Sequence, residues 1–428
     1  MSENKTEGNA TKPETSSMEN PNTIAVVSNA SGINKLDVDC LEELFEWLSL
    51  RDLRALRQTC KRMKQVVNYH IPLNYPLRFG RFEFVDDTFE DLCRFDASFT
   101  KLYKSIKFGY NPLTNYIIDG LKHILSNVER VVISDVQLNG TLYDNFLTFC
   151  SNLKILCIMD FSTMGIDSDW LLQQYPTLEQ LIISDAEPFE ENDKLQTFLE
   201  RNRNIKTLSI SSNILDTIPD AWIIESGVKL DKLEIEMLHL PENGMDQFCN
   251  RLNMLHENGF YKRLHFFVYC FCEGQQMFEI ANLRVLDVLF VEYLISATIL
   301  PPFNHLKAFY LDSDIDVDNM DSLVDNLPNI EIIHFKFADF ENILPFFRRS
   351  TKLKEIKINS PTDGRFLSDG IIDLVALNKE RKLCSGATKL TIYVKEQVYL
   401  STKFAKMRTK LSLIEIKRAE SHIFEHEY

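Results

Sequence analysis

Residues 153–183 read "LKILCIMDFSTMGIDSDWLLQQYPTLEQLII", and they hold one full unit of a pattern that recurs along the chain. The stretch opens with "LKILCI" and closes with "LEQLII", both of the form apolar-x-x-apolar-x-apolar. Alternation at the end of each six-residue pattern predicts a short β-strand, because successive side chains of a strand point to opposite faces. Leu171 and Tyr175 are four residues apart and so share one face of a helix, which must end before Pro176. The unit is therefore one strand and one helix.

The six-residue pattern occurs fourteen times. Its first residue, called position one, is Phe79, Tyr103, Val128, Leu153, Leu178, Ile205, Leu230, Tyr261, Leu283, Leu306, Ile330, Leu353, Ala387 and Leu411. The intervals are 22–27 residues, except for 31 before Tyr261 and 34 before Ala387, which indicate insertions. Each unit alone exposes an apolar face, and stacking against its neighbours buries that face.

The repeat resembles the leucine-rich repeat, from Phe79 to the end of the chain. The resemblance implies an α/β fold, a solenoid with a curved parallel sheet and outer helices, built from about fourteen units over residues 76–428. The family usually places Asn or Cys three positions after the last core residue, where it binds backbone groups. Asn111 and Asn213 keep that residue, whereas Val136, Phe161 and Ala186 replace it, so a continuous asparagine ladder is not expected and the curvature is expected to be irregular.

A different pattern precedes the repeats, "LDVDCLEELFEWLSLRDLRALRQTCKRMKQVV" at residues 36–67. It predicts three short helices, of which the first has an apolar stripe at helical spacing and the second begins with a capping box at Ser49 and Asp52. The first stripe comprises Leu41, Leu44, Phe45 and Leu48; Leu53 and Leu56 face inward from the second helix, and Cys60, Met63, Val66 and Val67 from the third. About forty residues cannot also bury Leu36, Trp47 and Leu50, and surplus apolar surface indicates a partner site.

This stretch resembles the F-box, the domain through which substrate receptors dock on the Skp1 adaptor of cullin–RING ubiquitin ligases. Its matching residues run from Leu36 through Leu41 and Asp52 to Cys60, while Asp37 stands in place of the usual proline and Met63 in place of a tryptophan. The resemblance implies Skp1 as a partner, and a cullin through it. Among the apolar residues, we expect Leu41, Leu53, Leu56 and Cys60 to pack internally. The expected Skp1 contacts are Leu36, Leu44, Phe45, Leu48 and Leu50.

Composition sets the remaining boundaries. Residues 1–34 are poor in large apolar side chains, which predicts a disordered N-terminal tail before an F-box at 35–75. A net charge of −15 argues against nucleic-acid binding, and Asp287 and Glu292 interrupt the best apolar run, so no membrane span is expected. Nine cysteines without a repeated CxxC fit reduced thiols. These features predict an intracellular protein, in the cytoplasm, the nucleus or both.

No catalytic motif is present, and the candidate metal sites are incomplete. "LDSDIDVDNMD" at 311–321 imitates a calcium loop but has Val317 at the glycine position and Leu323 at the glutamate position. Cys270 and Cys272 share one face of a predicted strand, without a third ligand in the sequence nearby. We therefore expect no catalytic residues, no metal and no cofactor, and we do not expect an enzyme.

The surface for a target protein is predicted from positions three and five of each repeat and from the residue after position six, which point away from the core. These positions are polar in several repeats and apolar in two groups. The first patch comprises Val132, Ile155, Cys157, Met159 and Ile182; the second patch comprises Phe267, Val285, Leu289, Tyr310 and Ile332. The second patch is favoured for target binding because aromatic anchors are enriched at interface centres. Alternatively, a terminal tail or the insertion before Tyr261 covers one patch.

Together these patterns predict a substrate-recognition adaptor of an SCF-type E3 ubiquitin ligase, which docks on Skp1 and holds an unknown target on its repeats. One alternative is a leucine-rich-repeat scaffold that binds proteins outside ubiquitination. In this alternative, Asp37 in place of the usual proline weakens the F-box so that it no longer recruits a ligase. Another is an F-box protein that acts with Skp1 alone.

Overall fold

The computed structural model describes residues 33, 36–45, 47–74, 77–79, 101–109, 114–134, 140–159, 170–184, 192–241, 244–294, 300–312, 317–362, 364–405 and 411–419. The tail predicted at residues 1–34 lies outside this part of the chain, apart from Ile33. The chain divides into two compact units, Met1–His70 and Ile71–Tyr428, which are described separately.

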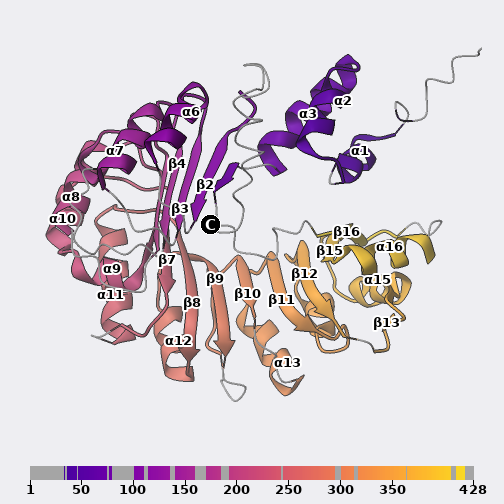
Figure 1. The fold of residues 1–428 in the computed structure, drawn as a ribbon. Helices are drawn as coiled ribbons and strands as arrows, with labels where there is room; N and C mark the ends of the chain where they lie inside the picture. Colours follow the sequence, from indigo (N-terminus) through magenta and orange to yellow (C-terminus); the bar gives the residue numbers. More distant parts are fainter. Residues whose placement is uncertain are drawn as a thin grey trace, which may run out of the picture. The chain divides into compact units, whose positions relative to one another are not determined.

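The first unit contains three helices, α1 (Val38–Phe45), α2 (Leu50–Arg57) and α3 (Lys61–Asn74), of which α3 continues into the second unit (Figure 1). Short polar side chains begin each helix. Asp37 Oδ1 accepts a hydrogen bond from the Cys40 backbone N–H at 2.8 Å, and Ser49 Oγ accepts one from Asp52 N–H at 3.2 Å. Cys60 Sγ accepts a hydrogen bond from Met63 N–H at 3.5 Å. The residue in place of the usual proline, Asp37, therefore still defines the start of α1.

Among the described residues of the second unit, fourteen strands form one parallel sheet, and their order in space is their order in sequence (Figure 1). The strands are β1 (Leu77–Phe79), β2 (Ser105–Gly109), β3 (Arg130–Ser134), β4 (Ile155–Met159), β5 (Gln180–Ser184), β6 (Thr207–Ser211), β7 (Lys232–Met237), β8 (Leu264–Cys272), β9 (Leu286–Leu294), β10 (Ala308–Leu311), β11 (Ile332–Ala338), β12 (Glu355–Pro361), β15 (Leu390–Val394) and β16 (Ile414–Arg418). A short antiparallel pair, β13 (Leu367–Ser368) and β14 (Ile371–Ile372), lies in the insertion before Ala387. The predicted leucine-rich-repeat solenoid is confirmed.

Helices connect most of the strands and lie against one face of the sheet (Figure 1); the opposite face is called the open face below. The helical segments are α6 (Asn115–Leu125), α7 (Gly140–Phe149), η2 (Trp170–Leu172), α8 (Asn192–Arg201), α9 (Ser212–Thr217), α10 (Asp220–Glu225), α11 (Met245–Glu257), α12 (Gly274–Ala281), α13 (Val317–Asn326), α14 (Leu344–Arg349), α15 (Leu374–Lys382) and α16 (Glu396–Ala405). In β2 burial alternates: Ile106 and Phe108 are buried and Lys107 between them is half-buried. In β3 to β6 the intervening residue is buried as well. The core therefore lies between the sheet and the helices.

The first repeat starts earlier than the sequence pattern predicts. Phe79, expected at position one, pairs with Phe108, which is position six of the next repeat. Residues 80–84, the rest of the predicted pattern, lie outside the described part of the chain. Leu77 and Phe79 are two residues apart, and so are Phe82 and Phe84, so alternation alone could not fix where this repeat begins.

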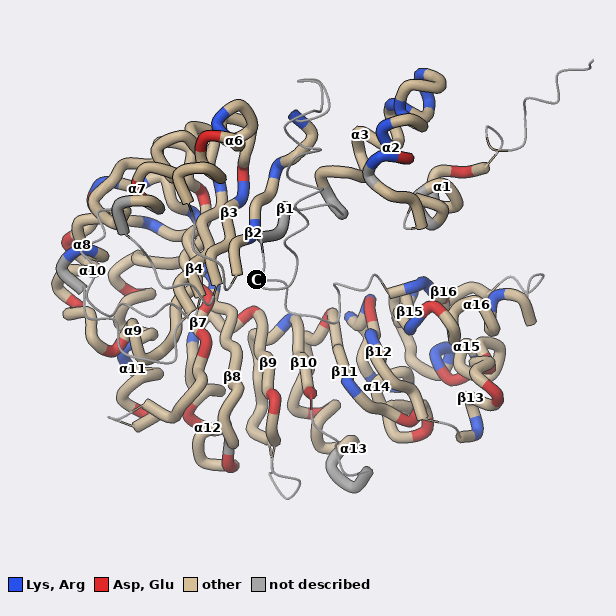
Figure 2. The backbone as a smooth tube through the Cα atoms, in the orientation of Figure 1, with Lys and Arg blue, Asp and Glu red and all other residues tan. Residues whose placement is uncertain are grey.

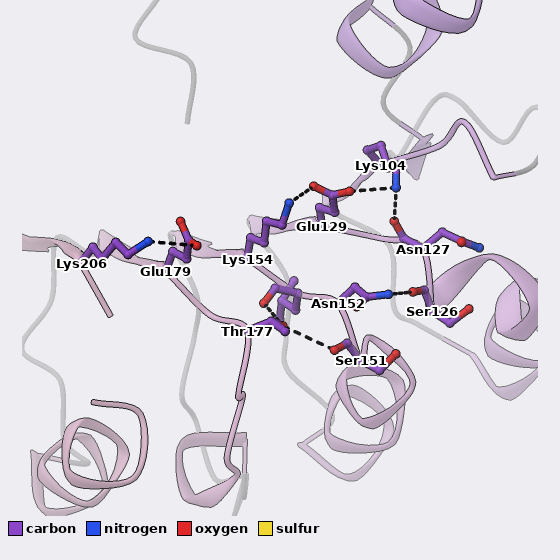
Figure 3. A network of polar contacts seen from close by, with 11 residues as sticks. Lys104, Ser126, Asn127, Glu129, Ser151, Asn152, Lys154, Thr177, Glu179 and Lys206 are labelled. Atoms are coloured by element: carbon purple, nitrogen blue, oxygen red, sulfur yellow. Dashed lines mark hydrogen bonds and ion pairs between the residues drawn. The ribbon is translucent and has the colours of Figure 1, made fainter. Parts of the chain in front are cut away.

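A ladder of side-chain hydrogen bonds joins neighbouring repeats on the turn before each strand. The residue just before position one donates to a backbone carbonyl of the previous repeat: Asn152 to Ser126 at 2.6 Å, Asn204 to Pro176 at 3.1 Å and Asn329 to Asn304 at 2.6 Å. Figure 3 shows this ladder from Asn152 to Thr177, whose hydroxyl takes the same role. At the position that the family usually gives to Asn, after the strand, Asn213 lies in α9 and Asn111 is outside the described residues.

Position two carries a second ladder, in which charge alternates from repeat to repeat. The residues are Lys104, Glu129, Lys154, Glu179, Lys206, Asp231 and Lys262. Ion pairs join Glu129 to Lys104 at 2.8 Å and to Lys154 at 2.7 Å, and further pairs follow along the row (Figure 3). Parallel strands in register set equivalent residues about 4.8 Å apart, so like charges here would repel and opposite charges attract.

Reversing one charge in the ladder tests this account. Glu129→Lys is expected to lower the free energy of unfolding by about 1 kcal/mol, because partly exposed pairs are screened by solvent. Hydrogen bonds from Lys104 and Lys154 lower the pKa of Glu129. Its contribution is therefore complete above the unfolded pKa, about 4.3, and is lost as the pH falls through the lower folded pKa. Urea denaturation at low and high salt measures the effect, with Glu225→Lys on α10 as control. A loss that is equal in both variants, or independent of salt, contradicts the ladder's role.

Candidate functional site

The most exposed apolar side chain among the described residues of the first unit lies on the turn between α1 and α2. The Trp47 side chain is 86% exposed, and Val38 at the start of α1 is 45% exposed. Three of the predicted adaptor contacts are half-buried: Leu36, Leu44 and Leu48. The side chain of Leu50 is not among those that the structure describes. Their role as contacts stays a prediction. Trp47, which the sequence marked only as surplus, offers the largest exposed fraction.

Phe45 does not belong to this surface. Its side chain is fully buried and meets the edge of His70 on α3 with ring centroids 5.3 Å apart, so it holds the helices together. Burial beside this ring lowers the pKa of His70. The sequence predicted Phe45 as an adaptor contact because it belongs to the apolar stripe of α1. The spacing of such a stripe does not show which of its residues are buried by the neighbouring helices.

Cys60 is also placed differently from its prediction. It is exposed rather than internal, and the Met63 N–H that it caps lowers the pKa of its thiol. Met63 itself is 1% exposed and fills the position that the family gives to tryptophan.

The second patch forms an aromatic row on the open face. Strand register aligns Phe267 with Phe290, Phe290 with Tyr310 and Tyr310 with His334. Ring centroids are 6.3 Å apart for Phe267 and Phe290, and 5.5 Å apart, edge to face, for Tyr310 and His334. Phe267, Val285, Tyr310 and Ile332 are half-buried, as a shallow binding surface requires.

Leu289, however, was assigned to the wrong face. It is fully buried and pairs with Phe266 and Phe309, both core residues, and Phe290 takes its place in the aromatic row. The cause is a register shift between β8 and β9: Leu264 pairs with Leu286, but His265 pairs with Val288, which leaves Asp287 as an extra residue. One extra residue moves every later side chain of the strand to the other face.

The first patch is a closed cluster rather than a surface. Val132, Cys157 and Ile182 are 2%, 0% and 5% exposed, and Ile155 and Met159 pack against them. Burial raises the pKa of the Cys157 thiol to about 12. The insertion before Tyr261 does not cover it, because α11 packs through Phe248 onto Phe266 on the helical side. The second patch is therefore the better candidate for binding.

Polar side chains border the aromatic row on both sides. Lys232 and His265 lie 2.7 and 3.4 Å from Glu234 Oε1. Burial disfavours the charged form of Glu234, but hydrogen bonds and charge from His265 and Lys232 outweigh it and hold the pKa of that carboxyl below its usual value. On the other side, His334 Nε2 lies 2.6 Å from Asn359 Oδ1. The row is thus flanked by groups that are already hydrogen-bonded, which suits a surface whose free energy of binding comes from the rings.

The described residues show no metal centre and no membrane span. No group of three or more His, Cys, Asp or Glu among them is arranged to hold a metal ion, and residues 313–316 of the imitation calcium loop, with Asp314 and Asp316, fall outside them. Within the same part of the chain, no helix is both long and apolar enough to cross a bilayer.

Comparison with known proteins finds a family match in the N-terminal part of the chain. The family model of the F-box domain matches residues 33–74. No curated protein matches the chain in sequence. Among solved structures, the yeast Rad7–Elc1 complex aligns over 90% of this chain and 98% of that chain, with 13% identity and a TM-score of 0.33. A TLR13–ssRNA13 complex aligns over 76% of this chain and 43% of that one, with 12% identity and a TM-score of 0.29. This chain carries an F-box domain at residues 33–74 and, after it, a leucine-rich-repeat solenoid.

Proposed function

We propose that the chain is the substrate-recognition subunit of an SCF-type ubiquitin ligase. In this role, the F-box docks on a Skp1 adaptor and through it on a cullin, inside the cell. The observation that carries the proposal is the F-box match over residues 33–74, together with the exposed Trp47 beside half-buried Leu44 and Leu48. An apolar anchor of this kind, ringed by partly covered side chains, is typical of a protein-docking surface.

The chain itself supplies binding and no chemistry in this proposal. The solenoid holds the target, and other subunits bring the ubiquitin-charged enzyme. Tethering makes the attack of a target lysine effectively intramolecular, so the rate rises through effective concentration. Fourteen strands about 4.8 Å apart give roughly 60 Å of sheet along which a target can lie.

Affinity purification separates this proposal from its alternatives. The wild-type chain and a version lacking residues 36–67 are purified side by side. Loss of Skp1 and cullin from the shortened version, with other partners retained, supports the ligase role. Skp1 without cullin on the wild type favours an F-box protein that acts with Skp1 alone, and neither on the wild type favours a scaffold outside ubiquitination. The cap that Asp37 provides to α1 argues against a weakened F-box.

The aromatic row is the proposed target site. The half-buried rings of Phe267 and Tyr310 form its centre. Phe290, which is 7% exposed, lies between them in register in place of Leu289, and Val285 and Ile332 lie at its border. Three neighbouring strands contribute adjacent rings here, and aromatic side chains carry a large share of the free energy in most protein interfaces.

Removing two of these rings is expected to abolish target capture. Phe267→Ala with Tyr310→Ala takes away the anchors while leaving the core row through Phe266 and Phe309 intact. Capture of target proteins is measured by affinity purification, with Skp1 recovery and thermal stability measured on the same samples. Tyr116→Ala on α6, where the ring is 71% exposed, is the control. If the double variant keeps every wild-type partner, the target binds elsewhere.

A further inference from the structure

Two large rings lie exposed at the carboxyl ends of β8 and β9. Each of these strands has nine residues, whereas β2 to β6 have five, and the extra length runs past the last fully buried pair, Val268 and Val291. Beyond that pair, Phe271 and Tyr293 are register partners and are 68% and 43% exposed. Their rings stack with centroids 4.9 Å apart and an interplanar angle of 27°. Phe271 and Tyr293 are together called the strand-end pair below.

Acidic side chains surround the strand-end pair. The Glu292 carboxylate is hydrogen-bonded to Tyr293 and, with Asp312 nearby, raises the pKa of that phenol. Figure 2 shows acidic positions on β7, on β9 and after β10. Among the described residues, no lysine or arginine forms an ion pair with Glu292. Lys336, which is paired with Asp312, acts on Glu292 and Tyr293 through its charge. The Glu292 carboxylate thus lies beside an exposed aromatic pair and makes no ion pair of its own in the described part of the chain.

The chain already binds one cation in this way a short distance along the same edge. The Lys336 ammonium lies 2.7 Å from Asp312 Oδ2 and 5.9 Å from the centroid of Phe337, at the end of β11. A carboxylate and a ring thus hold a cationic side chain between them, since the ring face is negative and the carboxylate adds charge. Glu292 and the strand-end pair present the same two elements, and the nearby Lys336 is held by Asp312 and forms no ion pair with Glu292.

We propose that the target presents a basic segment, one of whose arginine or lysine side chains stacks on Phe271 and Tyr293 and pairs with Glu292. The inference names the chemistry of the target and so rests on the proposed function. Arginine fits best, because its planar guanidinium stacks on a ring and still donates two parallel hydrogen bonds to a carboxylate. The net charge of −15 on the chain also favours the approach of a basic partner.

A library of random twelve-residue peptides displayed on phage is the probe, selected against the full-length chain in complex with its adaptor. The expected result is enrichment of peptides that carry Arg or Lys next to large apolar residues. One enriched peptide, fluorescently labelled, is then titrated against the variants by anisotropy. Its affinity is expected to fall about fivefold or more for Phe271→Ser with Tyr293→Ser, and about threefold for Glu292→Gln, as for partly exposed cation–π and ion-pair contacts.

Matched controls exist elsewhere on the chain. Phe404→Ser on α16 removes a ring that is 66% exposed, close to the 68% of Phe271, and Glu225→Gln removes an exposed charge on α10. Neither control is expected to change the affinity. Raising the salt concentration should weaken binding to the wild type and should have less effect on Glu292→Gln.

Three outcomes would overturn the inference: no enriched peptide, enrichment of neutral or acidic peptides, or equal affinity for the wild type and the strand-end double variant. Recovery of Skp1 is measured on the same preparations. If the strand-end double variant loses peptide binding but still recovers Skp1, the loss is due to the strand-end pair and leaves the proposed ligase role untouched. Absence of Skp1 from the wild type would instead remove the proposed ligase role, whatever the peptides show.

Discussion

Trp47→Ala combined with Leu44→Ala is expected to abolish capture of a Skp1 adaptor while the solenoid remains folded. Trp47 is 86% exposed and Leu44 half-buried, so neither contributes much to the core of the first unit. At an interface of ordinary size, a buried tryptophan anchor and its neighbour together account for several kcal/mol of binding free energy, about 4 kcal/mol or more. A loss of that size weakens binding by roughly a thousandfold.

Co-purification with Skp1 measures this effect, and two further variants define its meaning. Phe404→Ala on α16 removes a ring of similar exposure outside the F-box and should leave Skp1 capture unchanged. Phe45→Ala should also lose Skp1, but through unfolding, because Phe45 is fully buried against His70. Circular dichroism and proteolysis separate the two causes. Wild-type Skp1 recovery by the Trp47 and Leu44 double variant would show that docking uses another surface.

Arg381→Met is expected to have the largest effect on folding. Arg381 is fully buried on α15, and its guanidinium donates to backbone carbonyls only. The acceptors are Ser350 at 2.8 Å, Leu353 at 3.0 Å, Phe347 and Thr388 at 3.2 Å, and Phe346 at 3.5 Å. Several of these carbonyls end α14, where the helix dipole favours a cation. Loss of the donors leaves buried acceptors unpaired, which should cost about 4 kcal/mol.

The loss should be local, because each repeat contacts mainly its neighbours. Hydrogen exchange is expected to show α14 to β16 opening first in Arg381→Met, with protection of β2 to β6 unchanged. Arg381→Lys should not restore stability, since one ammonium cannot reach the carbonyls that a fork of five donors reaches. Arg349→Met is the control: its side chain is 38% exposed and pairs with Asp321 and Asp325, so it should cost less than about 1 kcal/mol. Uniform loss of protection along the whole sheet would contradict this account.

The period of the apolar residues was enough to predict nearly every strand of the sheet, because burial in a repeat imposes the same spacing each time. Face assignments failed where the spacing changes locally. A single extra residue at Asp287 turned Leu289 into the core, and the apolar pattern around it looks the same in either register. The prediction for Phe45 was wrong for a different reason. Its ring packs against His70, which lies beyond residues 36–67, the stretch whose apolar pattern predicted the F-box helices.

Both ladders were present in the sequence but lay at positions that carry no apolar signal. Aligning the repeats on position one places Asn152, Asn204 and Asn329 in one column and the alternating charges of Lys104 and Glu129 in another. The strand-end pair had no comparable signal. Its exposure depends on how far β8 and β9 extend beyond the core. The packing of the strands determines that length, and the spacing of apolar residues in the sequence does not show it.

The alternating charges restrict how this array can change in length. Deleting one repeat, residues 128–152, would set Lys104 beside Lys154, and duplicating one would likewise place two equal charges side by side. Deleting residues 128–177 would instead bring Lys104 next to Glu179 and restore an attractive pair. Between β2 and β8, the solenoid can therefore gain or lose repeats without placing like charges side by side only in even numbers. The smallest change in length that keeps the charge alternation is two repeats.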